Sequence, residues 1–166
     1  MTMFKIHSIY IASQAGHLMS KRDSARLTAG VGIEGDRYAL GIGAFSGSIP
    51  AKIRDISLIA LTGIESANEE LVASGLKTYL PSEARRNIVI EGISPEALNQ
   101  LVGKEFFLGS IRLRATELCV PCERPASLSG KPNFISTFKN RGGIRAQVLD
   151  SGEIRVGDQF KDVLLA

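Results

Sequence analysis

The sequence has no tryptophan, two histidines and two cysteines, and its aromatic content is only 6%. Two cysteines are too few to staple a chain of this length with disulfides. No apolar run approaches the roughly 20 residues that a membrane helix needs, and the N-terminal residues lack the basic-then-apolar layout of a signal peptide. The few aromatic residues fall largely in apolar strand patterns, which disfavours a nucleic-acid surface. We therefore expect a soluble cytoplasmic protein with no nucleic-acid or membrane partner.

The chain is long enough to bury a core, and its composition is that of an ordinary globular protein. It has 166 residues, of which 44% are hydrophobic and 22% are charged, and no linker or repeat divides it. We expect a single domain over residues 1–166. Its formal charge is +3, and twelve of its twenty basic residues are arginines. The planar arginine fork matches phosphate and carboxylate oxygens better than a lysine ammonium does, so the positions of the arginines become informative.

Short strands separated by turn signals dominate the pattern of apolar residues. Strands are expected at residues 4–11, 55–60, 86–91, 106–108, 111–116, 144–149 and 153–156. Helices are expected at 62–72, at 94–98 behind the N-cap Ser94, and at 134–138. The turn at 109–110 predicts one hairpin, and the turn at 150–152 predicts a second between 144–149 and 153–156. The pattern indicates a mainly β (α+β) fold with short helices and a barrel-like sheet.

The segment Cys119-Val120-Pro121-Cys122 is the strongest local signal for chemistry, and four interpretations compete for it. A structural zinc site would need four ligands, whereas only one cysteine pair is present. A redox dithiol usually precedes a long helix, which Pro125 and the polar residues after it disfavour. Two inert, half-buried thiols are the third interpretation. The fourth is a single soft thiolate that serves as metal ligand or nucleophile, with Arg124 close in sequence.

Three turns carry arginine beside glycine or asparagine. They are Gly35-Asp36-Arg37, which follows a glycine-rich approach, and Arg85-Arg86-Asn87 and Arg141-Gly142-Gly143, which each stand at the entrance of an expected strand. Arginine forks and glycine-exposed backbone N–H groups at the mouth of a small barrel would together form an oxyanion site. The alternative is that Asp36 and Arg37 form a local pair and that the glycines only make turns.

The ordered series of motifs resembles the MOSC domain, the module named for the C-terminal part of molybdenum cofactor sulfurase. The resemblance runs from about Ile9 to Phe160, nearly the whole chain. It is carried by Gly32-Ile33-Glu34-Gly35-Asp36-Arg37-Tyr38, Arg85-Arg86-Asn87-Ile88-Val89 with Gly92, Gly103, Phe106 to Gly109, Cys119-Val120-Pro121-Cys122, Arg141-Gly142-Gly143 and Gly157-Asp158.

This resemblance implies a barrel-like fold similar to the β-barrel domain of pyruvate kinase, and a site for the molybdenum cofactor, a molybdopterin. Cys122 would be the functional thiol, either as catalytic molybdenum ligand or as carrier of a persulfide sulfur, and Cys119 would be accessory. Pro125 stands where several relatives have leucine. The residues that would surround the pterin and its phosphate are Asp36, Arg37, Arg85, Arg86, Asn87, Arg141, Gly142 and Gly143.

The function that the resemblance implies is a molybdenum-dependent oxidoreductase that reduces N-hydroxylated or N-oxygenated small molecules. Its electrons would come from a separate reductase, and the protein would be a monomer or homodimer. The alternatives are a non-catalytic sulfur or cofactor carrier that uses a Cys122 persulfide, and a redox protein that uses both cysteines. Pyridoxal phosphate binding also appears in descriptions of the family, but the sequence has no evident lysine site for it.

Overall fold

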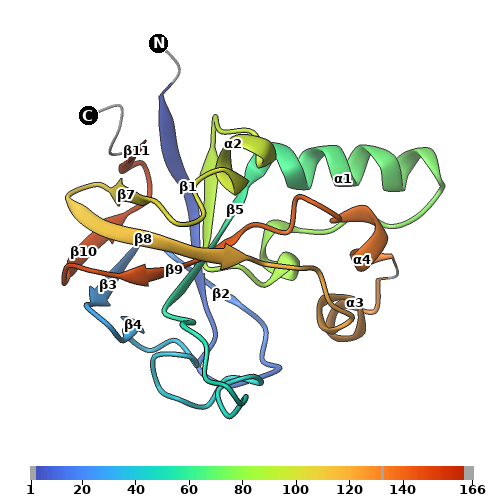
Figure 1. Cartoon of the computed structure of the whole chain (residues 1–166). Coiled ribbons are helices and arrows are strands. Elements are labelled where there is room, and N and C mark those ends of the chain that lie inside the picture. The colour runs from blue at the N-terminus through green and yellow to red at the C-terminus, as the bar shows by residue number, and fades with distance from the viewer. Residues whose placement is uncertain (1–2, 132, 163–166) are drawn as a thin grey trace.

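The computed structural model describes residues 3–131 and 133–162, and a closed β-barrel forms its centre (Figure 1). In this part of the chain seven strands close the ring, because the first of them pairs with the last. Around the ring they are β1 (Phe4–Ile11), β11 (Gln159–Asp162), β7 (Glu105–Leu108), β8 (Ile111–Leu118), β9 (Ile144–Val148), β5 (Ile56–Ala60) and β6 (Ile88–Glu91). The barrel that the sequence predicted is confirmed.

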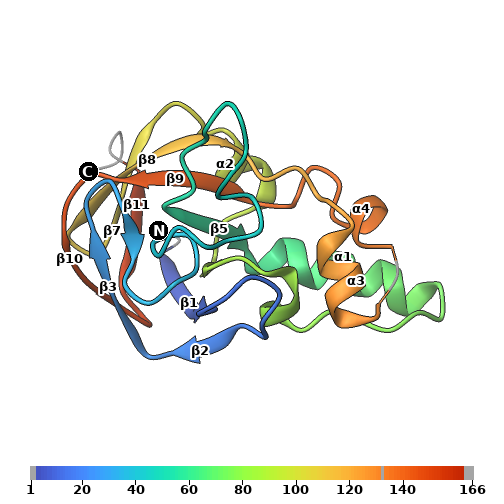
Figure 2. The ribbon, with the colours of Figure 1, turned by 90° about the horizontal axis from the view of Figure 1, so that it is seen from below.

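Short strands and helices surround the ring. The strand β2 (Ser20–Arg22) extends β1, and a separate small sheet contains β10 (Gly152–Arg155), β3 (Ser24–Thr28) and β4 (Gly32–Ile33). The helices are α1 (Leu61–Ala73), the 3-10 turn η1 (Pro81–Ala84), α2 (Pro95–Asn99), α3 (Arg124–Ser129) and α4 (Phe134–Thr137). Helices α1, α3 and α4 lie together at one end of the barrel (Figures 1 and 2). No helix within residues 3–131 and 133–162 is long and apolar enough to span a membrane.

Only β5 and β6 run parallel among the paired strands of the described chain, and α1 lies between them in sequence. Parallel neighbours need a crossover connection, which here is the expected amphipathic helix. The spacing of apolar residues predicts that Ile64, Ala67, Leu71 and Val72 share a buried face; the first three are buried, whereas Val72 is 66% exposed. The N-cap of α2 is also confirmed, because the backbone N–H of Ala97 donates to Ser94 Oγ over 3.1 Å.

Alternation along the strands gives the barrel wall two apolar faces. Inward residues such as Ile56, Leu58 and Ile144 belong to the core inside the ring. Outward residues such as Ile59 and Val89 pack in a second cluster with α1 and α4. Because side chains alternate along a strand, a polar residue of β5 or β9 that lies between two residues of the inner cluster faces outward.

The hairpin predicted across residues 150–152 is wrong. The strand β9 lies between β8 and β5, so both of its edges are occupied. The strand β10 pairs instead with β3, in a register that places Gly152 opposite Leu27. The turn was placed correctly, but the partner of the strand that follows it is set by long-range packing.

Candidate functional site

A cavity lies against the outer side of the barrel wall, beside the ends of β5, β6 and β9. Ser57 of β5 and Arg145 of β9 are register partners, and both lie between residues of the inner core, so their side chains face outward. The site therefore lies at these strand ends, with Ser57 and Arg145 on the outer face of the wall. Its lining residues are Arg37, Tyr38, Phe45, Arg54, Ile56, Ser57, Arg85, Arg86, Asn87, Cys119, Val120, Cys122, Arg124, Pro125 and Arg145.

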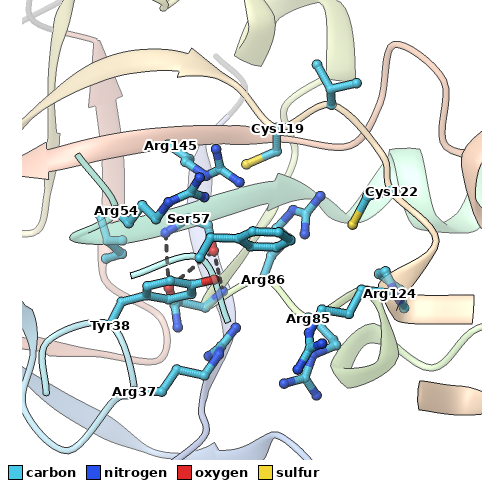
Figure 3. Close-up of a pocket in the computed structure, with 15 residues that line it drawn as sticks. Arg37, Tyr38, Arg54, Ser57, Arg85, Arg86, Cys119, Cys122, Arg124 and Arg145 are labelled. Atoms are coloured by element: carbon cyan, nitrogen blue, oxygen red, sulfur yellow. Dashed lines mark hydrogen bonds between the residues drawn. The ribbon is translucent and has the colours of Figure 1, made fainter. Parts of the chain in front are cut away.

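Both cysteines line this cavity together with six arginines (Figure 3). The arginines are Arg37, Arg54, Arg85, Arg86, Arg124 and Arg145. Among the described residues, only two of the six pair with a carboxylate: Arg37 with Asp36 at 3.0 Å, and Arg145 with Glu117 at 2.8 Å. Positive charge therefore exceeds negative charge around the cavity. An arrangement of this kind favours an anionic ligand.

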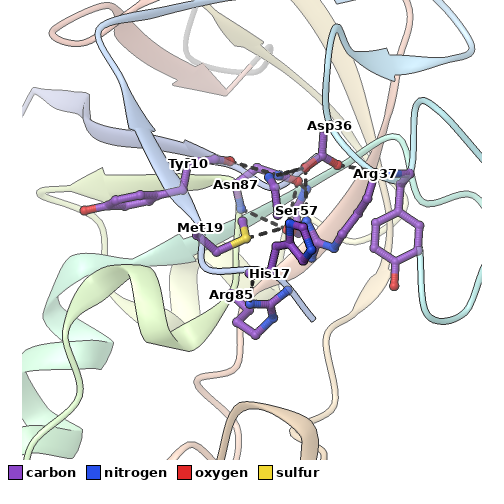
Figure 4. Close-up of polar contacts among 10 residues, drawn as sticks. Tyr10, His17, Met19, Asp36, Arg37, Ser57, Arg85 and Asn87 are labelled. Carbon is purple, nitrogen blue, oxygen red and sulfur yellow. Dashed lines mark hydrogen bonds and ion pairs between the residues drawn. The ribbon is translucent and has the colours of Figure 1, made fainter. Parts of the chain in front are cut away.

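Asp36 is the centre of a group of polar contacts next to the cavity (Figure 4). It is fully buried, and Oδ1 accepts from Arg37 over 3.0 Å and from the backbone N–H of Ala12 over 3.1 Å. The same oxygen accepts from Asn87 Nδ2 over 3.4 Å, while Oδ2 accepts from the backbone N–H of Tyr38 over 3.3 Å. Asp36 thus holds Arg37 and Tyr38 in place, and it is not itself part of the cavity lining.

Asn87 ties three segments of the barrel wall together. Its Oδ1 accepts from the backbone N–H of Ser57 over 3.0 Å, and its Nδ2 donates to the carbonyl oxygen of Tyr10 over 3.1 Å. The amide is 4% exposed and its hydrogen-bonding capacity is used within the protein. Its role in this structure is to position the ends of β1, β5 and β6.

Arg85 is held in a conformation that few non-glycine residues adopt. It follows η1 with φ of 61°, in the left-handed region, and donates to the carbonyl oxygen of His17 over 2.7 Å. Burial lowers its pKa to about 10, and the positive charges of Arg37 and Arg124 add to the effect. The guanidinium is still charged at neutral pH, so its environment is one that an anion would stabilise.

The two thiols differ in exposure. Cys119 follows β8 and is 3% exposed, and its backbone N–H donates to the carbonyl oxygen of Gly143 over 2.8 Å. Cys122 is half-buried, and both thiols are free. The helix α3, which begins at Arg124, has only six residues, so no long helix follows the cysteines, as the sequence argument expected. Proline is tolerated in the first turn of a helix, which explains how α3 accommodates Pro125.

Arg141, Gly142 and Gly143 are predicted site residues that do not line the cavity. The Arg141 guanidinium pairs with Glu70 at 2.7 Å, and its Nε donates to the carbonyl oxygen of Thr137 over 2.8 Å. A side chain at Gly142 would collide with the carbonyl oxygen of Cys119, and one at Gly143 with that of Leu58. The two glycines therefore allow their backbone to lie close to that of Cys119 on one side and of Leu58 in β5 on the other. The carbonyl oxygen of Gly142 also accepts from Arg86 Nε over 2.8 Å.

The structure adds lining residues that the sequence argument missed, chiefly Arg54, Arg145, Ser57 and Phe45. Arg145 occupies an outward position of an alternating strand, and Arg54 stands just before another strand. Both features are visible in the sequence, but they become a shared site only when β5 and β9 are known to pair.

Comparison with known proteins agrees with the fold. A family model described as the MOSC domain matches residues 51–161. YuaD from Bacillus subtilis superposes with a TM-score of 0.77 at 20% identity, over 96% of this chain and 94% of that one. YiiM from Geobacillus stearothermophilus gives a TM-score of 0.71 at 12% identity, over 96% and 75% of the two chains. YiiM from Escherichia coli gives 0.64 at 15%, over 98% and 70%. A search of curated proteins finds no match.

The family match spans well over half of the chain, and the structural relatives share its barrel over nearly its whole length. The matched range contains the Arg85-Arg86-Asn87 turn, both cysteines and the Arg141-Gly142-Gly143 turn. The motif around Asp36 and Arg37 precedes that range but lies in the same structural unit. The chain belongs to the MOSC domain family, which is associated with binding of the molybdenum cofactor.

Proposed function

We propose that this protein binds the molybdenum cofactor in the arginine-lined cavity, with Cys122 as a ligand of the metal. The observation that carries the proposal is the placement of a half-exposed thiol in the same cavity as six arginines. Thiolates suit soft metals, and arginine forks suit phosphate oxygens. The donor set therefore fits a ligand that has a metal at one end and a phosphate at the other.

The absence of a bare metal site supports the same ligand. Within the residues that the structure describes, no group of three or more His, Cys, Asp and Glu side chains could hold a metal ion. A metal at Cys122 would thus need further ligands that arrive with it, as a pterin cofactor provides. Of the predicted binding residues, Arg37, Arg85 and Arg86 line the cavity, where they would meet the phosphate, while Asp36 holds Arg37 and accepts a hydrogen bond from Asn87.

We infer that the loaded protein is a small cytoplasmic oxidoreductase that acts on N-hydroxylated or N-oxygenated compounds. When bound, the cofactor supplies two-electron oxygen-transfer chemistry. Reduction of an N-hydroxyl group to N–H consumes two electrons and two protons and releases water, so a separate reductase must supply the electrons. The protein's own part is to hold the cofactor through Cys122 and the arginines, beside a cavity that a small molecule can enter.

The test of this proposal is the cofactor content of protein expressed in a host that makes the cofactor. Wild type should contain molybdenum and pterin in equal amounts. Arg124→Gln should weaken retention about tenfold or more, because Arg124 lines the cavity and forms no hydrogen bond with any described residue, so its donors are free to bind the anionic cofactor. Arg141→Gln is the matched control and should retain the cofactor, because Arg141 lies outside the cavity lining.

Two results would contradict the proposal. Wild type without molybdenum and pterin would exclude cofactor binding. A labile persulfide on Cys122 after exposure to a cysteine desulfurase, in protein that takes up no molybdenum, would assign the thiol to sulfur transfer. The half-exposure of Cys122 makes this carrier function the second candidate, since a sulfur donor can reach the thiol.

A further inference from the structure

The six cavity arginines divide into two groups. Arg37, Arg85 and Arg124 line the same cavity, and the positive charges of Arg37 and Arg124 help to lower the pKa of Arg85. The charge of Arg145 acts on Arg54 in the same way. Figure 3 shows Arg54 and Arg145 side by side near Cys119, whereas Arg85 and Arg124 lie on the side of Cys122. We call Arg54 and Arg145 the Cys119-side pair.

Arg54 lies between two aromatic rings of the cavity lining, and it forms no hydrogen bond with another described residue. Its guanidinium carbon lies 5.8 Å from the ring centroid of Tyr38 and 5.1 Å from that of Phe45, so two aromatic faces hold it. The Nε atom is buried, and no acceptor within residues 3–131 and 133–162 reaches it. Burial lowers the pKa of Arg54, and the charge of Arg145 lowers it further. The terminal N–H groups of Arg54, a residue of the cavity lining, are the donors that an oxyanion could reach.

The negative charge near this pair is too small to balance it. Glu117 accepts from Arg145 over 2.8 Å and from Lys52 over 3.4 Å, so three cationic side chains share one carboxylate. Burial raises the pKa of Glu117, but hydrogen bonding to Arg145 and the charges of Arg145 and Lys52 lower it more, so the carboxylate is ionised and already engaged. A second anion can therefore be accommodated.

We propose that the Cys119-side pair forms an oxyanion subsite, separate from Arg85 and Arg124 on the Cys122 side, which takes the carboxylate or phosphate of an anionic ligand. The oxyanion has two possible sources with the same chemistry: a second phosphate of a diphosphate ligand that spans the cavity, or the carboxylate of a small substrate. The residues of this subsite are present in the cofactor-free protein. Its test therefore does not depend on the proposed molybdenum chemistry.

The experiment is to soak crystals of the cofactor-free protein in tungstate, an oxyanion that anomalous scattering locates. Wild type should show one tungsten peak within hydrogen-bonding distance of Arg54 and Arg145, and a second beside Arg85 and Arg124. Arg54→Gln should lose the first peak and keep the second, and Arg124→Gln should do the reverse. Calorimetric titration should show the affinity of the first subsite falling about tenfold or more in Arg54→Gln.

Competition with two other anions distinguishes the sources. Inorganic pyrophosphate should displace both tungstates together if a diphosphate spans the cavity, whereas succinate should displace only the tungstate at the Cys119-side pair if this subsite selects carboxylates. Arg54→Lys keeps the charge without the planar fork and should weaken the first peak even if Arg54→Gln does not fold. A wild-type map with tungsten only beside Arg85 and Arg124, or a first peak that survives in Arg54→Gln, would overturn the proposal.

Discussion

Asp36→Ala is expected to lower the free energy of unfolding by about 3–5 kcal/mol, the range for removing one partner of a buried ion pair. Asp36 is fully buried, and the Arg37 side chain that it pairs with is only 9% exposed, so the substitution leaves a buried positive charge without its partner. The backbone N–H of Ala12 and the amide of Asn87 lose an acceptor at the same time. Urea denaturation followed by circular dichroism measures the change.

Two variants serve as controls for this effect. Asp23→Ala removes an exposed aspartate, and it should change the unfolding free energy by no more than about 0.5 kcal/mol. Asp36→Asn keeps an acceptor of the same shape and should cost less than Asp36→Ala. A loss below about 1 kcal/mol for Asp36→Ala would show that the network does not hold this wall of the cavity together.

The two cysteines are expected to differ sharply in their importance for cofactor retention. Cys122→Ala should reduce bound molybdenum at least tenfold, because it removes the proposed thiolate ligand. Cys119→Ala should retain most of the metal, since Cys119 is buried and its contribution here is the backbone contact to Gly143. Elemental analysis of both variants, purified from a host that makes the cofactor, gives the comparison.

The amounts of molybdenum bound by Cys119→Ala and by Cys122→Ala, compared with each other, distinguish the competing functions. Equal loss of molybdenum in Cys119→Ala and Cys122→Ala would favour a site that uses both thiols. Reversible formation of a disulfide between them, with activity lost equally in either variant, would identify a redox dithiol in place of a molybdenum site. Thermal unfolding of each variant shows whether a loss comes from the missing thiol or from instability.

The sequence predicted the strands of the barrel well because alternation of apolar residues is a local signal. The strand 4–11 and the strands on either side of the turn at 109–110 are found where they were expected. The partner of β10 was not predictable, since the turn at 150–152 fits a hairpin but β9 already has β5 and β8 on its two edges. Strand pairing depends on long-range packing that a local turn signal does not contain.

The candidate site was predictable to the extent that its residues lie in local motifs. Arg37, Arg85, Arg86 and Cys122 stand in such motifs, and the structure brings them to one cavity. Arg141 stands in a similar turn, yet its side chain is engaged by Glu70. Arg54 and Arg145 carry no motif and meet only through the pairing of β5 with β9, which sequence reasoning did not establish. Asp36 was predicted at the site, and its burial shows that it positions other residues.

X-ray absorption at the molybdenum edge tests the central claim most directly, because it counts the sulfur atoms bound to the metal. The measurement compares cofactor-loaded wild type with Cys122→Ser loaded by reconstitution at high cofactor concentration. We predict one sulfur ligand more in wild type than in Cys122→Ser, and no difference between wild type and Cys119→Ala. Identical sulfur counts in wild type and Cys122→Ser would contradict the assignment of Cys122 as the metal ligand.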